Sequence, residues 1–175
     1  MLADELTGED VGEDTAFVVE RDAFEHGGAT TSTTPSGERF VRIPVVCVGA
    51  NDAGGPGLVD RKGVVFLSET FIDERYGVQP DRLREFRVSG DAMAATIVPG
   101  DRLILDVGGC ESVIDGEICL VASSAGVLIR RIRMTGNGVT LVADNEQVDD
   151  QDLSLERWEE TYRPLARVLE IDRSA

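Results

Sequence analysis

The sequence predicts a mostly β domain, made of several small antiparallel sheets and one short helix, that follows a disordered acidic leader. Three observations support this prediction. From Arg39 onward, short apolar or alternating stretches are separated by turn residues, as is typical of strands. Residues 1–38 differ sharply in composition, and only residues 68–77 resemble a helix of any length. The 175 residues, 42% of them hydrophobic, suit one globular domain.

The leader, residues 1–38, holds ten acidic side chains and one basic side chain. A run of Gly, Ser, Thr and Pro follows from Gly27 to Gly37, and only residues 15–20 could form a short ordered piece. Such a composition buries too little apolar surface to fold by itself. We therefore expect a flexible leader and linker without a helix-turn-helix at 1–38, and a folded domain at 39–175.

Eight stretches of the folded domain are predicted as strands. They are FVRIPVVCV (40–48), GVVFL (63–67), LREFRVSG (83–90), DRLILDV (101–107), GEICLVA (116–122), GVLIRRIRM (126–134), GVTLVAD (138–144) and RPLARVLEI (163–171). SSAG before Val127 and TGNG before Val139 are hairpin signals.

The predicted helix, residues 68–77, has Ser68 as a plausible N-cap. Phe71, Ile72 and Tyr76 can share one face of it.

The charge balance excludes some classes of protein. A net charge of −16 with a single lysine, Lys62, argues against a nucleic-acid surface, because phosphate binding needs a basic face. The sequence has no apolar run long enough to span a membrane, and its first residues lack the basic-then-apolar pattern of a signal peptide. We therefore expect a cytoplasmic protein that contacts neither DNA nor a membrane.

Neither cysteine nor histidine chemistry is indicated. Cys47, Cys110 and Cys119 are odd in number and widely spaced, which fits neither a disulfide framework nor a metal site. The only histidine, His26, lies in the leader, which argues against a Ser-His-Asp triad. We expect no cofactor and no metal.

The most informative stretch is FRVSGDAMAATIVPGDRLILD, residues 86–106. It reads as a strand, a bend at Gly90, a short turn and a second strand that begins after Pro99-Gly100-Asp101. A bend of this kind lifts one side chain clear of the sheet, as nucleophile-bearing turns do, yet the residue at the bend is Ala92.

Five pieces in order carry a family resemblance: VSGDAM, PGDRLILD, DGEICLV, VLIRRI and LVADNEQ. Together they resemble the C-terminal peptidase domain shared by LexA, UmuD and the CI-type phage repressors, over about Arg42 to Ile171. These proteins cut their own chain with a serine and a lysine. The resemblance therefore implies a LexA-like β fold with a cleft.

The resemblance assigns roles to particular positions. Ala92 lies at the position of the nucleophilic serine, and Arg130 at that of the lysine base, facing it across the cleft. Ala53-Gly54, within the segment 49–57, matches the bond that is cut. The remaining motif positions are Ser89, Gly90, Asp91, Met93, Pro99, Gly100 and Asp101.

Both catalytic positions are chemically unsuited to cleavage. Alanine has no nucleophilic atom. Arginine stays protonated in proteins, whereas a lysine in a desolvated pocket can lose its proton and act as a base. We expect a pseudo-peptidase.

Other side chains near the motif have structural explanations. Ser89 is a motif serine that is not the nucleophile, and Ser123 and Ser124 lie in a predicted hairpin. Asp91, Asp101 and Asp106 could suggest acid–base chemistry or a metal, but Pro-Gly-Asp is a turn signature.

Two functions remain open. One is a dimerisation and partner-binding module in phage-repressor or SOS-type regulation. The resemblance to UmuD implies a homodimer and a protein partner such as a recombinase filament or a polymerase. The apolar stretch 163–171 would lie at the dimer interface, since little else is available to cover it. The alternative is a monomer in which this stretch is an interior strand of the sheet. The other is a self-cleaving Ser-Lys peptidase that these substitutions have inactivated. A signal peptidase is a distant third, since no membrane anchor is apparent.

Overall fold

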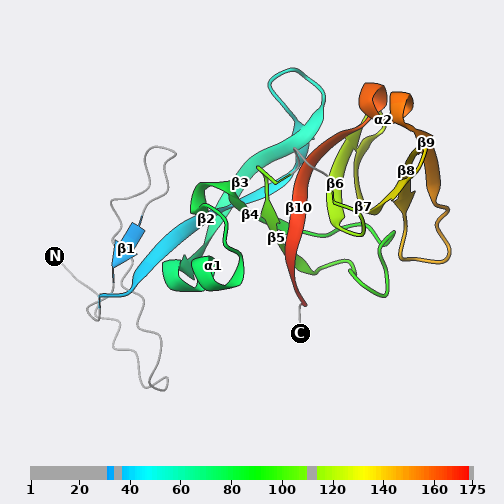
Figure 1. Cartoon of the computed structure of the whole chain (residues 1–175). Coiled ribbons are helices and arrows are strands. Elements are labelled where there is room, and N and C mark those ends of the chain that lie inside the picture. Colours follow the sequence, from blue (N-terminus) through cyan, green and yellow to red (C-terminus); the bar gives the residue numbers. More distant parts are fainter. Residues whose placement is uncertain (1–30, 34–36, 110–113, 174–175) are drawn as a thin grey trace.

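The computed structural model describes residues 31–33, 37–109 and 114–173 (Figure 1). The leader residues 1–30, with His26 and the stretch 15–20, lie outside the described residues, as does Cys110. The prediction of a mostly β domain is confirmed. The strands form one continuous sheet, however, rather than several small ones.

Ten strands make up the sheet within the described residues. They are β1 (Thr31–Thr33), β2 (Arg39–Ala50), β3 (Pro56–Ser68), β4 (Leu83–Arg87), β5 (Arg102–Asp106), β6 (Ile118–Ser123), β7 (Gly126–Thr135), β8 (Gly138–Val142), β9 (Gln151–Ser154) and β10 (Arg163–Asp172). Their order in space is β1-β2-β4-β5-β10-β6-β7-β8-β9, with β3 also paired to β2. Every pairing is antiparallel except the short parallel contact of β2 with β4.

Two α-helices, α1 (Glu69–Arg75) and α2 (Leu155–Thr161), and the 3-10 turn η1 (Pro80–Arg82) connect strands in the described segments. Helix α1 begins as predicted, with the Ser68 hydroxyl accepting from the Phe71 N–H at 3.3 Å. Its Ile72 is fully buried, whereas Phe71 remains 41% exposed. No helix among these residues is long and apolar enough to cross a membrane.

The sequence did not predict β1, the first half of β3, η1, β9 or α2. Strand β1 lies within the predicted flexible leader, yet its three residues pair with β2, so the sheet begins before residue 39. Strand β9 reads QDLS, in which Leu153 is the one buried side chain, so it carries no alternating apolar pattern. Helix α2 has no fully buried residue, although its Trp158 packs against the apolar cluster under β6–β9. Its start is nevertheless capped, because the Ser154 hydroxyl accepts from the Arg157 N–H at 3.2 Å.

Strand β10 lies inside the sheet, between β5 and β6 (Figure 1). Residues 167–172 pair with β5 and residues 163–167 pair with β6, with a bulge in each ladder. The expectation that little in the chain is available to cover stretch 163–171 is therefore wrong as far as its backbone is concerned. Strands β5 and β6 hydrogen-bond to its two edges.

The central apolar core lies beneath the turn that was singled out in the sequence. Phe86 and Val88 lead into this turn, Met93 and Ile97 lie within it, and all four are buried. Two further clusters lie under β6–β9 and between α1 and the sheet. The motif turn is thus part of the core.

A fully buried carboxylate, that of Asp106, joins distant segments at the end of β5. Arg82 donates to both of its oxygens, from Nε at 2.9 Å and from Nη2 at 2.8 Å. Arg167 of β10 donates from Nη2 at 3.2 Å and also reaches Glu117 through Nη1 at 3.0 Å. The Gly108 N–H adds a fourth bond to Asp106, at 3.0 Å. Asp106 therefore has a structural role.

Replacing this carboxylate should be costly. We expect Asp106→Asn to lower the free energy of unfolding by about 2–4 kcal/mol, because it leaves Arg82 without its anion and Arg167 with Glu117 alone. The side chains of Arg82 and Arg167 remain 37% and 23% exposed, which keeps the loss below that of a fully buried pair. Urea denaturation of both proteins measures the difference.

Asp172→Asn is the matched control. It removes the same charge from the pair of Asp172 with Arg102, whose side chains are 49% and 43% exposed. A surface pair of this kind contributes about 1 kcal/mol or less. Equal losses in the two variants would contradict the role assigned to Asp106.

Candidate functional site

The chain between β4 and β5 forms a closed loop that presents Ala92. At the neck of the loop, the Val88 N–H donates to the Asp101 carbonyl and the Gly100 N–H donates to the Val88 carbonyl, both at 2.9 Å. Inside the loop, the Ala94 N–H donates to the Asp91 carbonyl at 2.8 Å. Ala92 therefore lies at the start of a short turn, as the sequence predicts.

Buried side chains fix this loop to the domain. Met93 and Ile97 are 2% and 0% exposed. Asp101, 2% exposed, accepts from the Val98 N–H through Oδ2 at 2.9 Å. Asp101 and the preceding Gly100, whose φ is +99°, therefore shape the turn. Ala95 also has a left-handed φ, of +86°, which is uncommon for a residue with a Cβ.

The segment after β8 braces the same turn. Asn145 donates its side-chain Nδ2 to the Asp91 carbonyl at 3.0 Å and its backbone N–H to the Ala92 carbonyl at 3.2 Å. The preceding Asp144 accepts two bonds from Arg131 of β7, at 3.1 and 2.7 Å. Hydrogen bonding by Arg131 lowers the pKa of the Asp144 carboxyl, so this brace persists well below neutral pH.

Ala92 and Arg130 line one cavity of about 210 Å³, which brings the two predicted catalytic positions together. Its walls come from β2, the end of β4, the turn and β7. The lining residues are Val48, Phe86, Val88, Ser89, Gly90, Asp91, Ala92, Met93, Val127, Leu128, Ile129 and Arg130. Pro99, Gly100 and Asp101 do not line it.

Arg130 is 6% exposed at its place on β7. Its Nη1 donates to the carbonyl of the adjacent Ile129 at 2.8 Å, and its buried Nε has no partner among the described residues. Burial lowers the pKa of the Arg130 guanidinium, and the charge of Asp150 opposes this shift through space. A guanidinium remains protonated at neutral pH even so, which makes Arg130 a buried cation.

The segment that resembles a cleavage site forms the turn between β2 and β3, which projects beyond the sheet (Figure 1). Asn51 Oδ1 accepts from the N–H groups of Ala53 and Gly55, at 3.1 and 3.0 Å. The Gly54 N–H donates to the Asn51 carbonyl at 2.8 Å, with a φ of +79° at Gly54. The Ala53-Gly54 bond therefore lies in a turn whose hydrogen bonds are local, and neither residue lines the cavity.

Several contributors to the site carried no role in the sequence analysis. Val48 reaches the cavity from β2, Asn145 braces the turn, and Asp150 acts on Arg130. Only Asn145 had a signal, since it falls in the LVADNEQ motif. Ser123 is held in the β6–β7 turn, where its Oγ contacts the Gly126 carbonyl at 3.3 Å. Among the described residues, no group of His, Cys, Asp and Glu could hold a metal ion.

Comparison with known proteins agrees with this arrangement. The chain is 27% identical over 140 residues to a LexA repressor from Vibrio vulnificus, which covers 75% of this chain and 67% of that protein. It is 31% identical over 83 residues to an uncharacterized HTH-type transcriptional regulator from Haemophilus influenzae, which covers 45% of this chain and 34% of the regulator. Residues 45–168 match the profile of the family described as Peptidase S24-like. Because that match includes both the turn that presents Ala92 and the strand that carries Arg130, the chain belongs to the Peptidase S24-like family.

Proposed function

We propose that this domain is a pseudo-peptidase that acts as a dimerisation and partner-binding module in transcriptional regulation of the phage-repressor or SOS type. One observation carries the proposal: the cavity at the centre of the peptidase fold is lined by Ala92 and Arg130. The first side chain has no atom to attack a carbonyl, and the second holds its proton at neutral pH. The names of the similar LexA repressor and HTH-type regulator support a regulatory setting.

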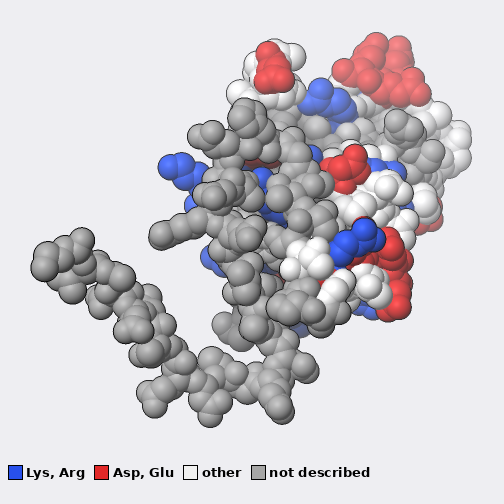
Figure 2. Space-filling view, turned by 90° about the vertical axis from the view of Figure 1, so that its left-hand side faces the viewer, with Lys and Arg blue, Asp and Glu red and all other residues white. Residues whose placement is uncertain are grey.

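The acidic character of the chain supports a protein partner over DNA. On the face drawn in Figure 2, acidic side chains form dense groups and basic side chains are interspersed with acidic ones. Several arginines are already paired with carboxylates, including Arg39 with Glu69 and Arg75 with Glu170. With a net charge of −16, contacts to phosphate would have to overcome long-range repulsion.

An inactivated self-cleaving peptidase is the alternative. The observation that favours it is the complete frame around the site, with the neck of the loop closed and the turn braced by Asn145. On this view the two substitutions alone prevent cleavage of Ala53-Gly54, and restoring both residues would restore activity.

A variant series separates the two functions. We expect Ala92→Ser alone to remain intact, because Arg130 cannot take the hydroxyl proton. If the chain is an inactivated peptidase, Ala92→Ser with Arg130→Lys should cut after Ala53, into pieces of 53 and 122 residues. If it is the proposed non-cleaving module, this double variant should stay intact. Intact-mass spectrometry after incubation at neutral to alkaline pH measures the products.

The matched control is Ala92→Ser with Arg133→Lys, which places a lysine on the same strand at an exposed position. It should stay uncut. Cleavage by the single Ala92→Ser variant would contradict the argument from Arg130. An intact double variant would eliminate the inactivated-peptidase alternative and favour the non-cleaving module.

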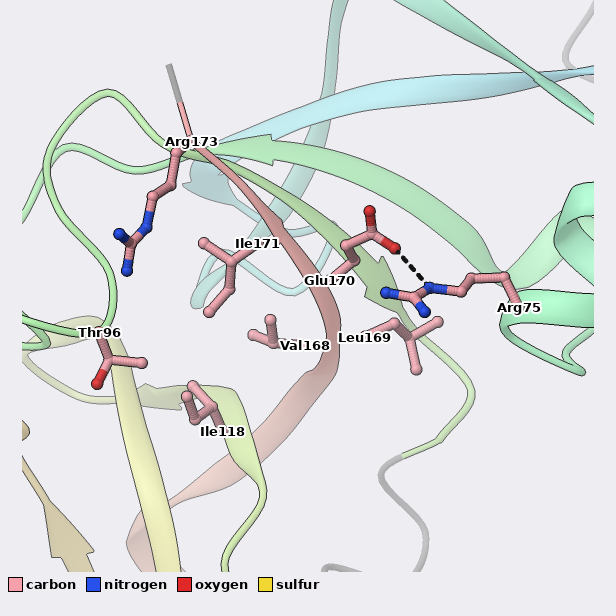
Figure 3. Close-up of a pocket in the computed structure, with 8 residues that line it drawn as sticks. All are labelled: Arg75, Thr96, Ile118, Val168, Leu169, Glu170, Ile171 and Arg173. Atoms are coloured by element: carbon pink, nitrogen blue, oxygen red, sulfur yellow. Dashed lines mark hydrogen bonds and ion pairs between the residues drawn. The ribbon is translucent and has the colours of Figure 1, made fainter. Parts of the chain in front are cut away.

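The proposed homodimer uses side chains of β10, since its backbone edges are already paired. A groove of about 460 Å³ runs beside this strand, with Ile118, Val168 and Ile171 along its floor (Figure 3). Arg75, paired with Glu170, and Arg173 flank it on opposite sides. A surface that carries apolar groups and both signs of charge can pair with its own copy across a two-fold axis.

We expect the chain to sediment at micromolar concentration with twice its 18.9-kDa monomer mass. Val168→Lys should shift it to the monomer, because the lysine charge would be buried against the partner copy. Met134→Lys, at an exposed site on β7 outside the groove, is the control and should remain dimeric. A single 19-kDa species for the unmodified chain would remove the dimer.

A further inference from the structure

Arg130 occupies a position at which the strand pattern favours an apolar side chain. Side chains alternate along β7, so that Arg130 and Ile132 are buried while Arg133 is exposed. A cation in such a position loses its hydration and needs an anion or hydrogen-bond acceptors in return. Within the described residues, the guanidinium makes one hydrogen bond, from Nη1 to the carbonyl of its own neighbour, Ile129.

Other arginines of the chain show what the Arg130 side chain is missing. Arg82 and Arg131 each hold a carboxylate with the same edge of the guanidinium, using Nε for one oxygen and Nη2 for the other. These two-pronged pairs have N–O distances of 2.7–3.1 Å. The Nε of Arg167 also lacks a partner, but that side chain bonds two carboxylates through its other nitrogens.

In Arg130, the Nε that forms half of this edge is buried without a partner among the described residues. Asp150 does not fill the role, because it acts on Arg130 through space only. Its Oδ1 instead accepts from the Ala143 N–H at 2.9 Å. Arg130 therefore places a buried cation, whose Nε lacks a partner among the described residues, at the wall of a cavity.

The remainder of the cavity is mainly apolar, apart from Ser89 and Asp91, which also line it. Val48, Val88 and Val127 contribute to the wall, together with the methyl group of Ala92. Its 210 Å³ equals the volume of about seven water molecules in the liquid, below that of most drug-sized pockets. The cavity thus suits a small anion that has an aliphatic body.

We propose that this cavity binds a carboxylate joined to a short aliphatic group, with the guanidinium of Arg130 donating to the carboxylate oxygens. The proposal rests on the proposed function, in that it names what the non-cleaving site holds. Two sources share this chemistry: a free short-chain carboxylic acid, and the C-terminal carboxylate of a peptide that ends in a small aliphatic residue. The net charge of −16 disfavours unspecific adsorption of anions, so binding must come from this local site.

Calorimetric titration of the full chain tests the proposal with three probes. The probes are isobutyrate, the peptide acetyl-Ser-Gly-Val with a free carboxylate, and the same peptide as its C-terminal amide. We expect a carboxylate probe to bind with a Kd of about 1 mM or below, a reasonable limit for a ligand of this size. Loss of the carboxylate should weaken peptide binding at least about tenfold. Tighter binding of isobutyrate assigns a free acid, and tighter binding of the peptide assigns a C-terminus.

Arg130→Gln should abolish carboxylate binding, whereas Arg133→Gln, which removes the same charge from the exposed face of β7, should leave the Kd within about twofold. Thermal unfolding supplies a second readout that does not depend on the titration. Without ligand, Arg130→Met should unfold at a higher temperature than the unmodified chain, because it removes a buried unpaired cation. Saturating ligand should raise the midpoint of the unmodified chain only.

Equal affinity for the acid and amide peptides, or an unchanged Kd in Arg130→Gln, would overturn the proposal, as would the absence of binding by both carboxylates. These outcomes are distinct from failure of the proposed function. Cleavage by Ala92→Ser alone would refute the pseudo-peptidase while leaving carboxylate binding in place. Absence of carboxylate binding, with no cleavage by Ala92→Ser, would refute the carboxylate site while leaving the pseudo-peptidase in place.

Discussion

The buried carboxylate of Asp106 is the interaction on which the two halves of the sheet depend. It lies at the end of β5, and its partners come from η1 and β10, while Arg167 continues to Glu117 just before β6. In the strand order, β5 ends one half of the sheet and β6 begins the other, and β10 lies between them and pairs with both. Taking a carboxylate out of water is expensive, so the energy is recovered only when all four donors are in place. The cluster therefore specifies the register of β10 between β5 and β6.

The candidate site is positioned by this frame rather than by its own contacts alone. The turn that presents Ala92 grows out of β4 and returns into β5, the strand that ends at Asp106. The opposite wall, with Arg130, belongs to β7, which reaches β5 only through β6 and β10. Asn145 then ties the turn to the segment after β8. A cleft between the two halves of the sheet can keep its shape without any catalytic group, because its geometry comes from the surrounding ladders.

The sequence predicted the parts of the fold that depend on local patterns. All eight predicted strands are present, as is the Ser68 cap of α1, because apolar alternation and helix capping depend on residues that are close in the sequence. Strand β9 and helix α2 were not predicted. Strand β9 has a single buried side chain and α2 has no fully buried one, so neither shows a clear apolar pattern in the sequence. The shared cavity of Ala92 and Arg130 was expected from the family resemblance. The interior place of β10, the contribution of Val48 and the unpartnered Nε of Arg130 could not be predicted, because they arise from segments far apart in the chain.

The place of β10 also has a consequence for how the domain is made. A ribosome completes β5 and β6 long before residues 163–172 exist, yet each of these strands has one edge that only β10 fills. Until then, the edges of β5 and β6 that pair with β10 in the finished sheet have no such partner. Closure is a long-range event with a high entropic cost, which makes this topology slow to fold and leaves its edges open to pairing with other chains. Strand β10, which connects the two halves of the finished sheet, is thus the last strand to be synthesised among those described.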